Sequence, residues 1–461
     1  MLPLLLLSLA FSYAVFQKGG VWPQDWNISL LILGLLALFY RPRTPVPRLE
    51  PWLRWPLILL PAYAAFQLLP LPIPLLRLLS PARAEIQAAL GGNFAPLSVV
   101  PAATLRHFLR IAVYVLVFLL VRELAWRLSR RPWSLAFPLV AIAALEAALG
   151  LVQFYSKASE AVARGTYVNR NHYAGLLEMS LPFALMYPVA VLRRNRSPDH
   201  SPVRPALIAC AVLALAALIL LGIIHSLSRM GFIAALVSLF VCGTAILLQT
   251  ARYKLWSASR KLLVVLFVAA LILLGFIFLP PDQLIARFGQ LAFSDGITSQ
   301  DRLQLWRETL PLIAAYPLFG CGLGGYESAF MKYKISEPMF RDDYAHNDYL
   351  QYLAELGTIG FLIAAALIVA VVLQAARAAG RTQAVACLAA FAAILLHSTV
   401  DFNLYIPANA MLLAWISGIS VSLMFSSNPA PAWRPRGLPQ VIELEPASPW
   451  RFLLASSNQL R

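Results

Sequence analysis

The chain has 461 residues, of which 60% are hydrophobic and only 13% are charged. A soluble protein carries about a quarter of its residues as charges, so this composition excludes a water-soluble globular enzyme. Lys and Arg number 37 against 21 Asp and Glu, a formal net charge of +16, which indicates either nucleic-acid binding or basic cytoplasmic loops.

Apolar segments of membrane-spanning length recur along the chain. At about 20 apolar residues per span, the sequence predicts about twelve transmembrane helices, near residues 1–16, 27–40, 54–72, 105–121, 133–155, 171–192, 205–225, 229–250, 262–280, 346–373, 382–400 and 405–425. The predicted fold class is an all-α integral membrane protein with a large helical periplasmic loop between spans nine and ten. Residues 1–425 form the predicted membrane domain, and the proline-containing residues 426–461 form a cytoplasmic C-terminal tail.

Basic residues are concentrated in alternate loops. These loops and the tail hold 22 of the 37 Lys and Arg residues and five acidic residues, in segments 41–54, 122–131, 193–204, 252–261, 377–381 and 434–461. The positive-inside rule assigns these segments and both termini to the cytoplasm. The net charge is therefore an orientation signal, and no nucleic-acid partner is expected. The polar intervals 73–104 and 281–345 then face the periplasm or cell exterior.

Neither the cysteines nor the glycines predict a metal or cofactor site. The four cysteines show no CxxC or other metal-ligand spacing, which makes a zinc site and a disulfide framework unlikely. Gly320, Gly322 and Gly325 satisfy the G-x-G-x-x-G pattern, but no strand precedes them, so they do not indicate a dinucleotide site. We interpret them as a flexible turn after Pro317, and we expect no metal and no cofactor.

Two arginines on the predicted outer side lie where a helix begins. Arg229 follows Ser226 and Ser228, either of which would cap span eight, and Arg302 lies in the first turn of a loop helix that begins near Thr298. A helix N-terminus disfavours a cation and attracts an anion. Phosphate fits best, because guanidinium and backbone N–H groups both donate to it. The alternative is that each arginine reaches lipid headgroups or a nearby carboxylate.

His346 stands at the predicted start of span ten. If the helix begins there, Asn347, Gln351 and Glu355 form one polar stripe that descends into the membrane. Such a stripe faces the bundle interior or a wet cavity. A histidine at its mouth suits a general base toward a sugar hydroxyl, because imidazole titrates at about pH 6.5. The alternative is a histidine that hydrogen-bonds a loop carbonyl.

A second polar cluster opens the sixth span. Asn169, Arg170 and His172 belong to the run Thr-Tyr-Val-Asn-Arg-Asn-His-Tyr at 166–173. His172 is a weaker candidate for a base because Arg170 lies close to it. A third polar group is predicted at the outer end of span eleven and consists of His397, Asp401 and Asn403.

The order of these motifs resembles the O-antigen ligase and polymerase family of polytopic membrane glycosyltransferases. The resemblance is densest from about 165 to 360, and the run His-Asn-Asp-Tyr-Leu-Gln-Tyr-Leu-Ala-Glu-Leu-Gly-Thr-Ile-Gly at 346–360 is its most specific part. The other matching segments are Asn-Arg-Asn-His at 169–172, Ser-Arg-Met-Gly at 228–231, Asp-Arg at 301–302 with Trp306, and Pro-Leu-Phe-Gly-Cys-Gly-Leu-Gly-Gly at 317–325.

The resemblance implies an inverting, metal-independent transferase of the bacterial inner membrane. Such an enzyme takes a glycan from an undecaprenyl-diphosphate-linked donor on the periplasmic face. Arg229 and Arg302 match the family's essential arginines, which implies that they bind the carrier diphosphate and stabilise the leaving group. His346 matches the family's loop histidine, the implied base for the acceptor hydroxyl. The predicted substrate-binding residues are Asn169, Arg170, His172, Asn347 and Gln351.

The resemblance leaves the acceptor open. Members of this superfamily join glycans to lipid A-core, extend glycan repeat units or act as protein O-oligosaccharyltransferases. The expected partners are thus the donor, one of these acceptors and membrane lipids. A secondary transporter or permease of small anions is the alternative from another class, although its inverted repeats and midplane polar residues are not clearly present. A lipid-linked glycan flippase would place basic residues deep in the bundle, whereas here they lie at span ends.

Overall fold

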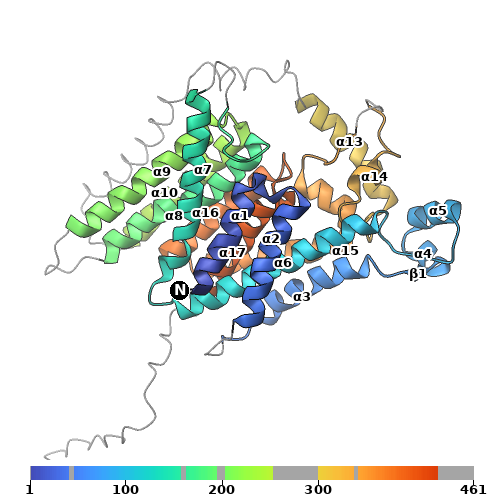
Figure 1. Cartoon of the computed structure of the whole chain (residues 1–461), viewed down its shortest axis with the longest axis horizontal. Coiled ribbons are helices and arrows are strands. Elements are labelled where there is room, and N and C mark those ends of the chain that lie inside the picture. The colour runs from blue at the N-terminus through green and yellow to red at the C-terminus, as the bar shows by residue number, and fades with distance from the viewer. Residues whose placement is uncertain are drawn as a thin grey trace, which may run out of the picture. The chain divides into compact units, whose positions relative to one another are not determined.

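The computed structural model describes residues 2–40, 46–156, 162–194, 203–252, 299–336 and 341–423 (Figure 1). The predicted ninth span, 262–280, lies outside the described residues. So do residues 281–298 of the predicted outer loop and the tail, 426–461.

Helices make up most of the described chain, as the apolar segments predict. The α-helices are α1 (Leu2–Phe16), α2 (Pro23–Phe39), α3 (Pro51–Phe66), α4 (Ile73–Leu79), α5 (Pro81–Leu90), α6 (Pro101–Arg127), α7 (Phe137–Ser156), α8 (Arg170–Arg194), α9 (Val203–His225), α10 (Arg229–Arg252), α13 (Ser299–Ala315), α14 (Tyr326–Phe330), α15 (Asp348–Arg377), α16 (Thr382–His397) and α17 (Pro407–Ser422). Three short 3-10 helices are η1 (Lys18–Gly20), η2 (Pro132–Leu135) and η3 (Asn403–Tyr405).

The all-α fold class is confirmed for the described residues, with one short pair of strands. Strand β1 (Leu71–Pro72) pairs antiparallel with β2 (Phe94–Ala95), and the short helices α4 and α5 lie between the two strands in sequence. The helix in the predicted third span, 54–72, ends earlier, at Phe66. The other regular elements of the described residues are helices.

Several helices have the length and composition of membrane spans. Within the described residues, five helices are long and apolar enough to cross a membrane: Pro132–Ser156, Arg170–Arg194, Val203–His225, Arg229–Leu247 and Asp348–Arg377. Four shorter apolar helices, α1, α2, α16 and α17, accompany them. A multi-pass helical membrane protein is thus confirmed, and the count of about twelve spans stays a prediction.

Helix α8 lies at the centre of the bundle. It packs against α7, α9, α10 and α16, and almost every residue from His172 to Ala184 is buried. Small residues allow this close approach: a methyl group at Gly231 of α10 would lie only 2.5 Å from the Cβ of Ala174. On another side of the bundle, α15 packs against α3, and α17 packs against α6 (Figure 1).

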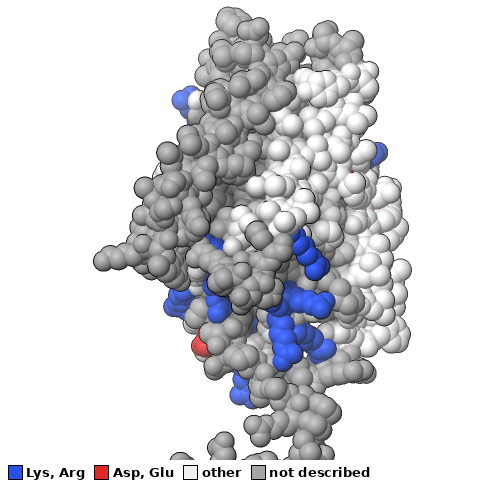
Figure 2. Space-filling view, turned by 90° about the vertical axis from the view of Figure 1, so that its left-hand side faces the viewer, with Lys and Arg blue, Asp and Glu red and all other residues white. Residues whose placement is uncertain are grey.

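The predicted cytoplasmic loops come together at one end of the bundle, here called the basic end. The guanidinium of Arg127 lies 5.0 Å from the ring centre of Tyr40, and that of Arg377 lies 4.7 Å from the ring centre of Trp52. Gln249 donates to the carbonyl of Ala379 over 2.8 Å. These contacts join segments next to four of the six basic stretches. Figure 2 shows Lys and Arg side chains gathered on one part of a face of the molecule.

The two predicted outer intervals also meet, at what is here called the outer end. The backbone N–H of Val99 donates to the carbonyl of Cys321 over 2.8 Å, and the Thr104 hydroxyl donates to the carbonyl of Leu323 over 2.8 Å. The interval 73–104 therefore packs on the glycine-rich turn of the larger loop. This agrees with the prediction that both intervals lie on one side of the membrane.

Candidate active site at the outer end

Four helices begin at the outer end with a residue singled out in the sequence. Asn169 precedes α8, Arg229 is the first residue of α10, Arg302 lies in the first turn of α13, and Asn347 caps α15. The first backbone N–H groups of a helix have no partner within that helix. Helix N-termini with arginines among them provide donors and positive potential for an anion.

The loop before α15 holds His346 in a fixed place. The Asn347 side chain accepts from the backbone N–H groups of Tyr349 and Leu350, so it is the N-cap of α15. The predicted start of span ten at His346 is wrong by two residues, because His346 precedes this cap in a left-handed conformation with φ +48°. Such a backbone is strained for a non-glycine residue and is kept only where surrounding contacts impose it.

Two hydrogen bonds to Ala345 supply that constraint. The backbone N–H of Ala345 donates to Oε1 of Gln351 over 2.6 Å, and the Trp306 indole donates to the Ala345 carbonyl over 2.9 Å. Trp306 belongs to α13, the helix that carries Arg302. The histidine loop is thus attached both to α15 and to the arginine helix.

Asp401 lies between two histidines that are far apart in the sequence. Its Oδ1 is 3.7 Å from Nδ1 of His346 and 3.5 Å from Nε2 of His172. Both imidazole rings also pack edge-on against Phe402, with ring centres 4.9 and 4.6 Å away. Asp401 is 1% exposed, so its charge is compensated by these neighbours and not by water.

The charges around Asp401 determine its protonation. Burial by itself would raise the pKa of Asp401, but the contacts with His172 and His346 hold that pKa well below its ordinary value. Arg302 adds positive charge nearby and donates from Nη1 to the carbonyl of Val400 over 2.8 Å. Asp401 is therefore an anion, and it lies beside both imidazole rings.

The two predicted arginines lie within electrostatic range of each other. Burial lowers the pKa of the Arg302 guanidinium, Asp401 opposes this effect, and Arg229 adds to it. Ser228 caps α10 as predicted, because its hydroxyl oxygen accepts from the backbone N–H of Gly231 over 3.2 Å. Two cations this close repel each other, and an anion between them would relieve the repulsion.

The predicted polar stripe is present on α15, but its two deeper residues form hydrogen bonds with other groups of the protein. Gln351 and Glu355 are buried, and Nε2 of Gln351 donates to Oε1 of Glu355 over 3.0 Å. Glu355 accepts from the backbone N–H groups of Gly324 and Tyr326, and from the Tyr405 hydroxyl. In this structure Gln351 positions the histidine loop, while Glu355 holds the glycine-rich turn.

That turn packs against a break in α15. Gly357 interrupts the helix with φ +64°, and a methyl group there would lie 2.4 Å from the backbone nitrogen of Gly320. Gly320 itself has φ +71°, and its added methyl group would lie 2.2 Å from the carbonyl oxygen of Glu355. Both positions require glycine for conformation and for space. The predicted turn is confirmed in place, and it is closely packed.

The residues at the start of α8 have different roles, because some hold the helix and one belongs to the candidate site. Asn169 accepts from the backbone N–H of Asn171 over 2.8 Å and so caps α8. Arg170 is the first residue of α8 and is partly exposed. His172 reaches Asp401, with its Nε2 3.5 Å from Oδ1. Its backbone carbonyl accepts from the Asn409 amide over 2.9 Å, which ties α8 to α17.

Sequence reasoning noticed Asp401 and His397 without finding their partners. His397 lies 2.9 Å from Oε2 of Glu178 on α8, and both side chains are buried. The loop between α16 and η3 that carries Asp401 is fixed to α15, because Asp348 accepts from the Ser398 hydroxyl over 2.7 Å and from the Leu404 N–H. The signal in the sequence was three polar residues at the end of an apolar helix.

The arrangement combines three chemical capacities. Two arginines and several helix N-termini suit a polyanion such as a diphosphate. A histidine beside a buried carboxylate suits general base catalysis, since the carboxylate stabilises the imidazolium that forms. The bundle around them gives the site a membrane environment.

The comparison with protein families gives the same result for the part of the chain that carries these groups. Residues 214–365 match the family model described as O-antigen ligase, and this segment contains Arg229, Arg302 and His346. No curated protein matches the chain. The resemblance expected from the motifs is thereby confirmed over residues 214–365, the part of the chain that is similar to the O-antigen ligase family.

Proposed function

We propose that this protein is a membrane glycosyltransferase that transfers or polymerises a glycan from an undecaprenyl-diphosphate-linked donor at the outer end, on the periplasmic face. One observation carries the proposal: within the O-antigen ligase segment, Arg302 and His346 converge on the same buried carboxylate, Asp401. A coarser membrane glycosyltransferase role follows from the family and the apolar helices.

The donor's diphosphate is the group that fits the arginines. Arg229 and Arg302 would each contribute a guanidinium, and the first turns of α10 and α13 would contribute backbone N–H donors. Negative charge grows on the diphosphate as it leaves the sugar. Cations held in place before the reaction stabilise that charge without further rearrangement.

His346 would activate the acceptor. Its imidazole takes the proton from an acceptor hydroxyl, whose oxygen then forms a bond to the anomeric carbon of the donor glycan. The bond between that carbon and the diphosphate oxygen breaks, and its electron pair leaves with the lipid diphosphate. Attack opposite the leaving group inverts the anomeric centre. Asp401 stabilises the imidazolium until the proton passes to solvent.

The proposed base is tested by separating binding from turnover. Purified protein is given a lipid-diphosphate-linked oligosaccharide and an acceptor, and donor binding and product formation are measured for wild type and His346→Ala. We expect the variant to bind the donor with unchanged affinity and to lose about 10²–10⁴ in turnover, the usual contribution of a general base.

Loss of donor binding by His346→Ala would argue against a base and for a binding role. An absence of transfer by the wild type, together with flux of a small anion into proteoliposomes, would favour the permease alternative. The chemical nature of the product assigns the acceptor: longer glycan, glycosylated lipid or glycosylated protein.

A further inference from the structure

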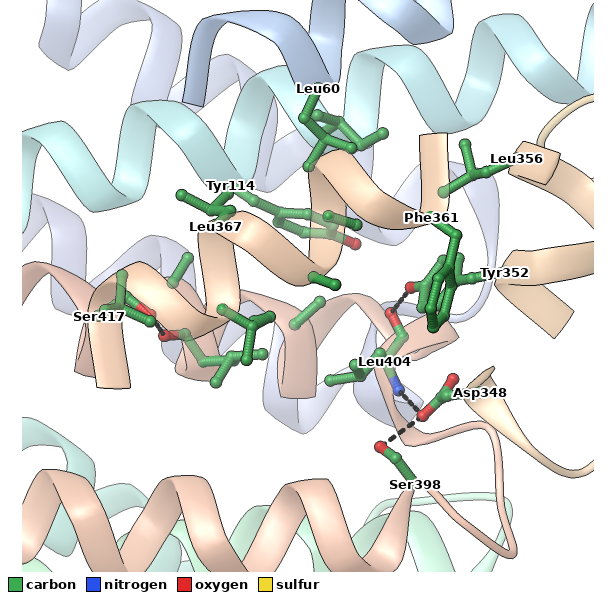
Figure 3. A pocket seen from close by; sticks show the side chains of 18 of the residues that line it. Leu60, Tyr114, Asp348, Tyr352, Leu356, Phe361, Leu367, Ser398, Leu404 and Ser417 are labelled. Atoms are coloured by element: carbon green, nitrogen blue, oxygen red, sulfur yellow. Dashed lines mark hydrogen bonds between the residues drawn. The ribbon is translucent and has the colours of Figure 1, made fainter. Parts of the chain in front are cut away.

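A cavity of about 410 Å³ lies beside the site, between α3, α6, α15 and α17 (Figure 3). Its walls are apolar over most of their length, and Leu60, Tyr114 and Leu367 line its middle part. Asp348 and Ser398 lie together at one end, as Figure 3 shows. Asp348 follows His346 by two residues, so this end adjoins the proposed base.

Arg110 of α6 also lines the cavity; it is partly exposed, and one of its guanidinium nitrogens, Nε, is buried without a hydrogen-bond partner among the described residues. Its guanidinium lies 5.3 Å from the ring centre of Trp26, an apolar surface that contributes a cation–π contact and no negative charge. A guanidinium at an apolar cavity is costly unless an anion accompanies it. The observation therefore indicates an anionic group within reach of Arg110.

The cavity is separate from the pair Arg229 and Arg302. None of α8, α10 and α13, which carry the rest of the site, contributes a described residue to its lining. The rings of Tyr344 and Phe402 stack with their centres 4.0 Å apart. Phe402 contacts the imidazole of His346, and Tyr344 contacts Tyr405, which lines the cavity. These aromatic contacts connect the cavity to His346 without involving the helices that carry the two arginines.

The volume sets the kind of ligand. An apolar cavity of about 150 Å³ takes one benzene molecule, so this one accommodates a hydrocarbon segment two to three times that size. One hydrocarbon chain of a lipid therefore fits this space. Apolar side chains around the cavity are exposed on α3 and α15, such as Ile58 and Leu362, so a chain can enter from the surrounding membrane.

We propose that this cavity binds one hydrocarbon chain of the acceptor, a lipid-anchored glycan whose phosphate pairs with Arg110. The assignment to the acceptor rests on the proposed function, since His346 receives the acceptor hydroxyl. The enzyme then holds two lipid-linked substrates, the donor at Arg229 and Arg302 and the acceptor in the cavity. Their glycans meet at His346.

Two variants with matched controls test the site. Arg110→Gln removes the cation, and Arg106→Gln removes an exposed arginine one turn earlier on the same helix that does not line the cavity. Ala365→Phe fills the cavity, and Ala366→Phe adds the same ring at the adjacent exposed position, which lies outside the lining. The KM values are measured for the donor, for a lipid-anchored acceptor and for the same glycan without its lipid.

Arg110→Gln and Ala365→Phe are expected to raise the KM for the lipid-anchored acceptor about tenfold. The first variant loses a charge-assisted contact with the phosphate, and the second loses the space for the hydrocarbon chain. The KM for the donor and for the lipid-free glycan should stay unchanged, as should all values for the two controls. A higher donor KM would assign the cavity to the donor and overturn the proposal, as would no change in any KM.

A second readout does not depend on transfer. Native mass spectrometry of the purified protein in detergent, with an added phosphate-bearing acceptor lipid, should show one bound lipid for the wild type and for Arg106→Gln. Arg110→Gln should lose it. Equal retention of the lipid by both variants would overturn the proposed site. A wild type that transfers no glycan would overturn the proposed function instead, and the lipid-binding result would still stand.

Discussion

The two ends of the bundle handle polar groups in different ways. At the basic end, arginines lie over aromatic rings or donate to backbone carbonyls. Arg377 lies over the ring of Trp52, and Arg381 donates to the carbonyl of Leu423. At the outer end, carboxylates and histidines are buried together, and Asp401, Glu355 and Gln351 each have at most 1% of their surface exposed. Burying such groups costs free energy unless every partner is provided.

The difference supports the proposal that the outer end carries the chemistry. The basic end holds most of the net charge, and that charge is satisfied by the aromatic and backbone groups common at membrane surfaces. The outer end has few charges, yet each is placed by helix caps, a left-handed histidine and glycines that admit no side chain. The number of basic residues at each end therefore indicates the orientation in the membrane, and the placement of the few charges at the outer end indicates the candidate site.

The largest contrast is expected between arginines of the two ends. Arg302→Ala should lower glycan transfer by about 10²–10³, the cost of removing one preorganised donor to a developing anion. Arg377→Ala, at the basic end, should change transfer less than twofold on the scale of surface substitutions, which alter stability by about 0.5 kcal/mol. Transfer rates are compared at equal protein levels in the membrane. Equal effects of the two substitutions would abolish the distinction between the ends.

The variant Asp401→Asn tests the outer end through glycan transfer and through the pH dependence of stability. We expect transfer to fall about tenfold to a hundredfold, less than for loss of the base itself, because the imidazolium at His346 loses its counterion. Since the folded-state pKa of Asp401 lies below the ordinary value of about 3.9, its stabilising contribution is present above pH 4 and disappears as the pH falls through the lower folded-state pKa.

Thermal unfolding in detergent measures this contribution. The gap between the unfolding temperatures of wild type and Asp401→Asn should persist from pH 8 to pH 5 and close only below about pH 4. A gap that closes near neutral pH would show that Asp401 is protonated there. Asp401 could then not serve as the counterion.

A smaller effect is expected from glycines. Gly320→Ala should destabilise the outer end by at least about 1–2 kcal/mol, because alanine resists a positive φ and its methyl group meets the Glu355 carbonyl. Gly380→Ala, in a loop of the basic end with nothing near its added methyl group, should change stability by less than about 0.5 kcal/mol. Unfolding temperatures compare the two. Equal stability of both variants would show that the glycine-rich turn is not constrained by α15.

The sequence predicted the helices and the positions of the arginines well. Long apolar runs with capping residues fix helix boundaries locally, so the predicted span 171–192 is α8 from Arg170 to Arg194, and the loop helix bearing Arg302 begins as expected. The family resemblance rested on the same local motifs. Its match over residues 214–365 confirms the resemblance there, while the motif at 169–172 lies outside the match.

What the sequence did not predict depends on contacts between distant segments. Asp401 reaches His172 and His346 only because α16 ends beside the start of α8 and of α15. The left-handed backbone of His346 depends on the bonds of Ala345 with Gln351 and Trp306, and the break at Gly357 depends on the packing of the glycine-rich turn. No local pattern reveals either contact. The cavity next to Arg110 likewise exists only between assembled helices.

The central claim, that glycan transfer takes place at the outer end, is tested most directly by the sidedness of the reaction. A short-chain, water-soluble lipid-diphosphate donor that cannot cross the membrane is added to right-side-out spheroplasts and to inside-out vesicles that contain the protein. We predict transfer in the spheroplasts, dependent on Arg302 and His346, and none in intact inside-out vesicles. Transfer only in the inside-out vesicles would place the chemistry at the basic end and contradict this account.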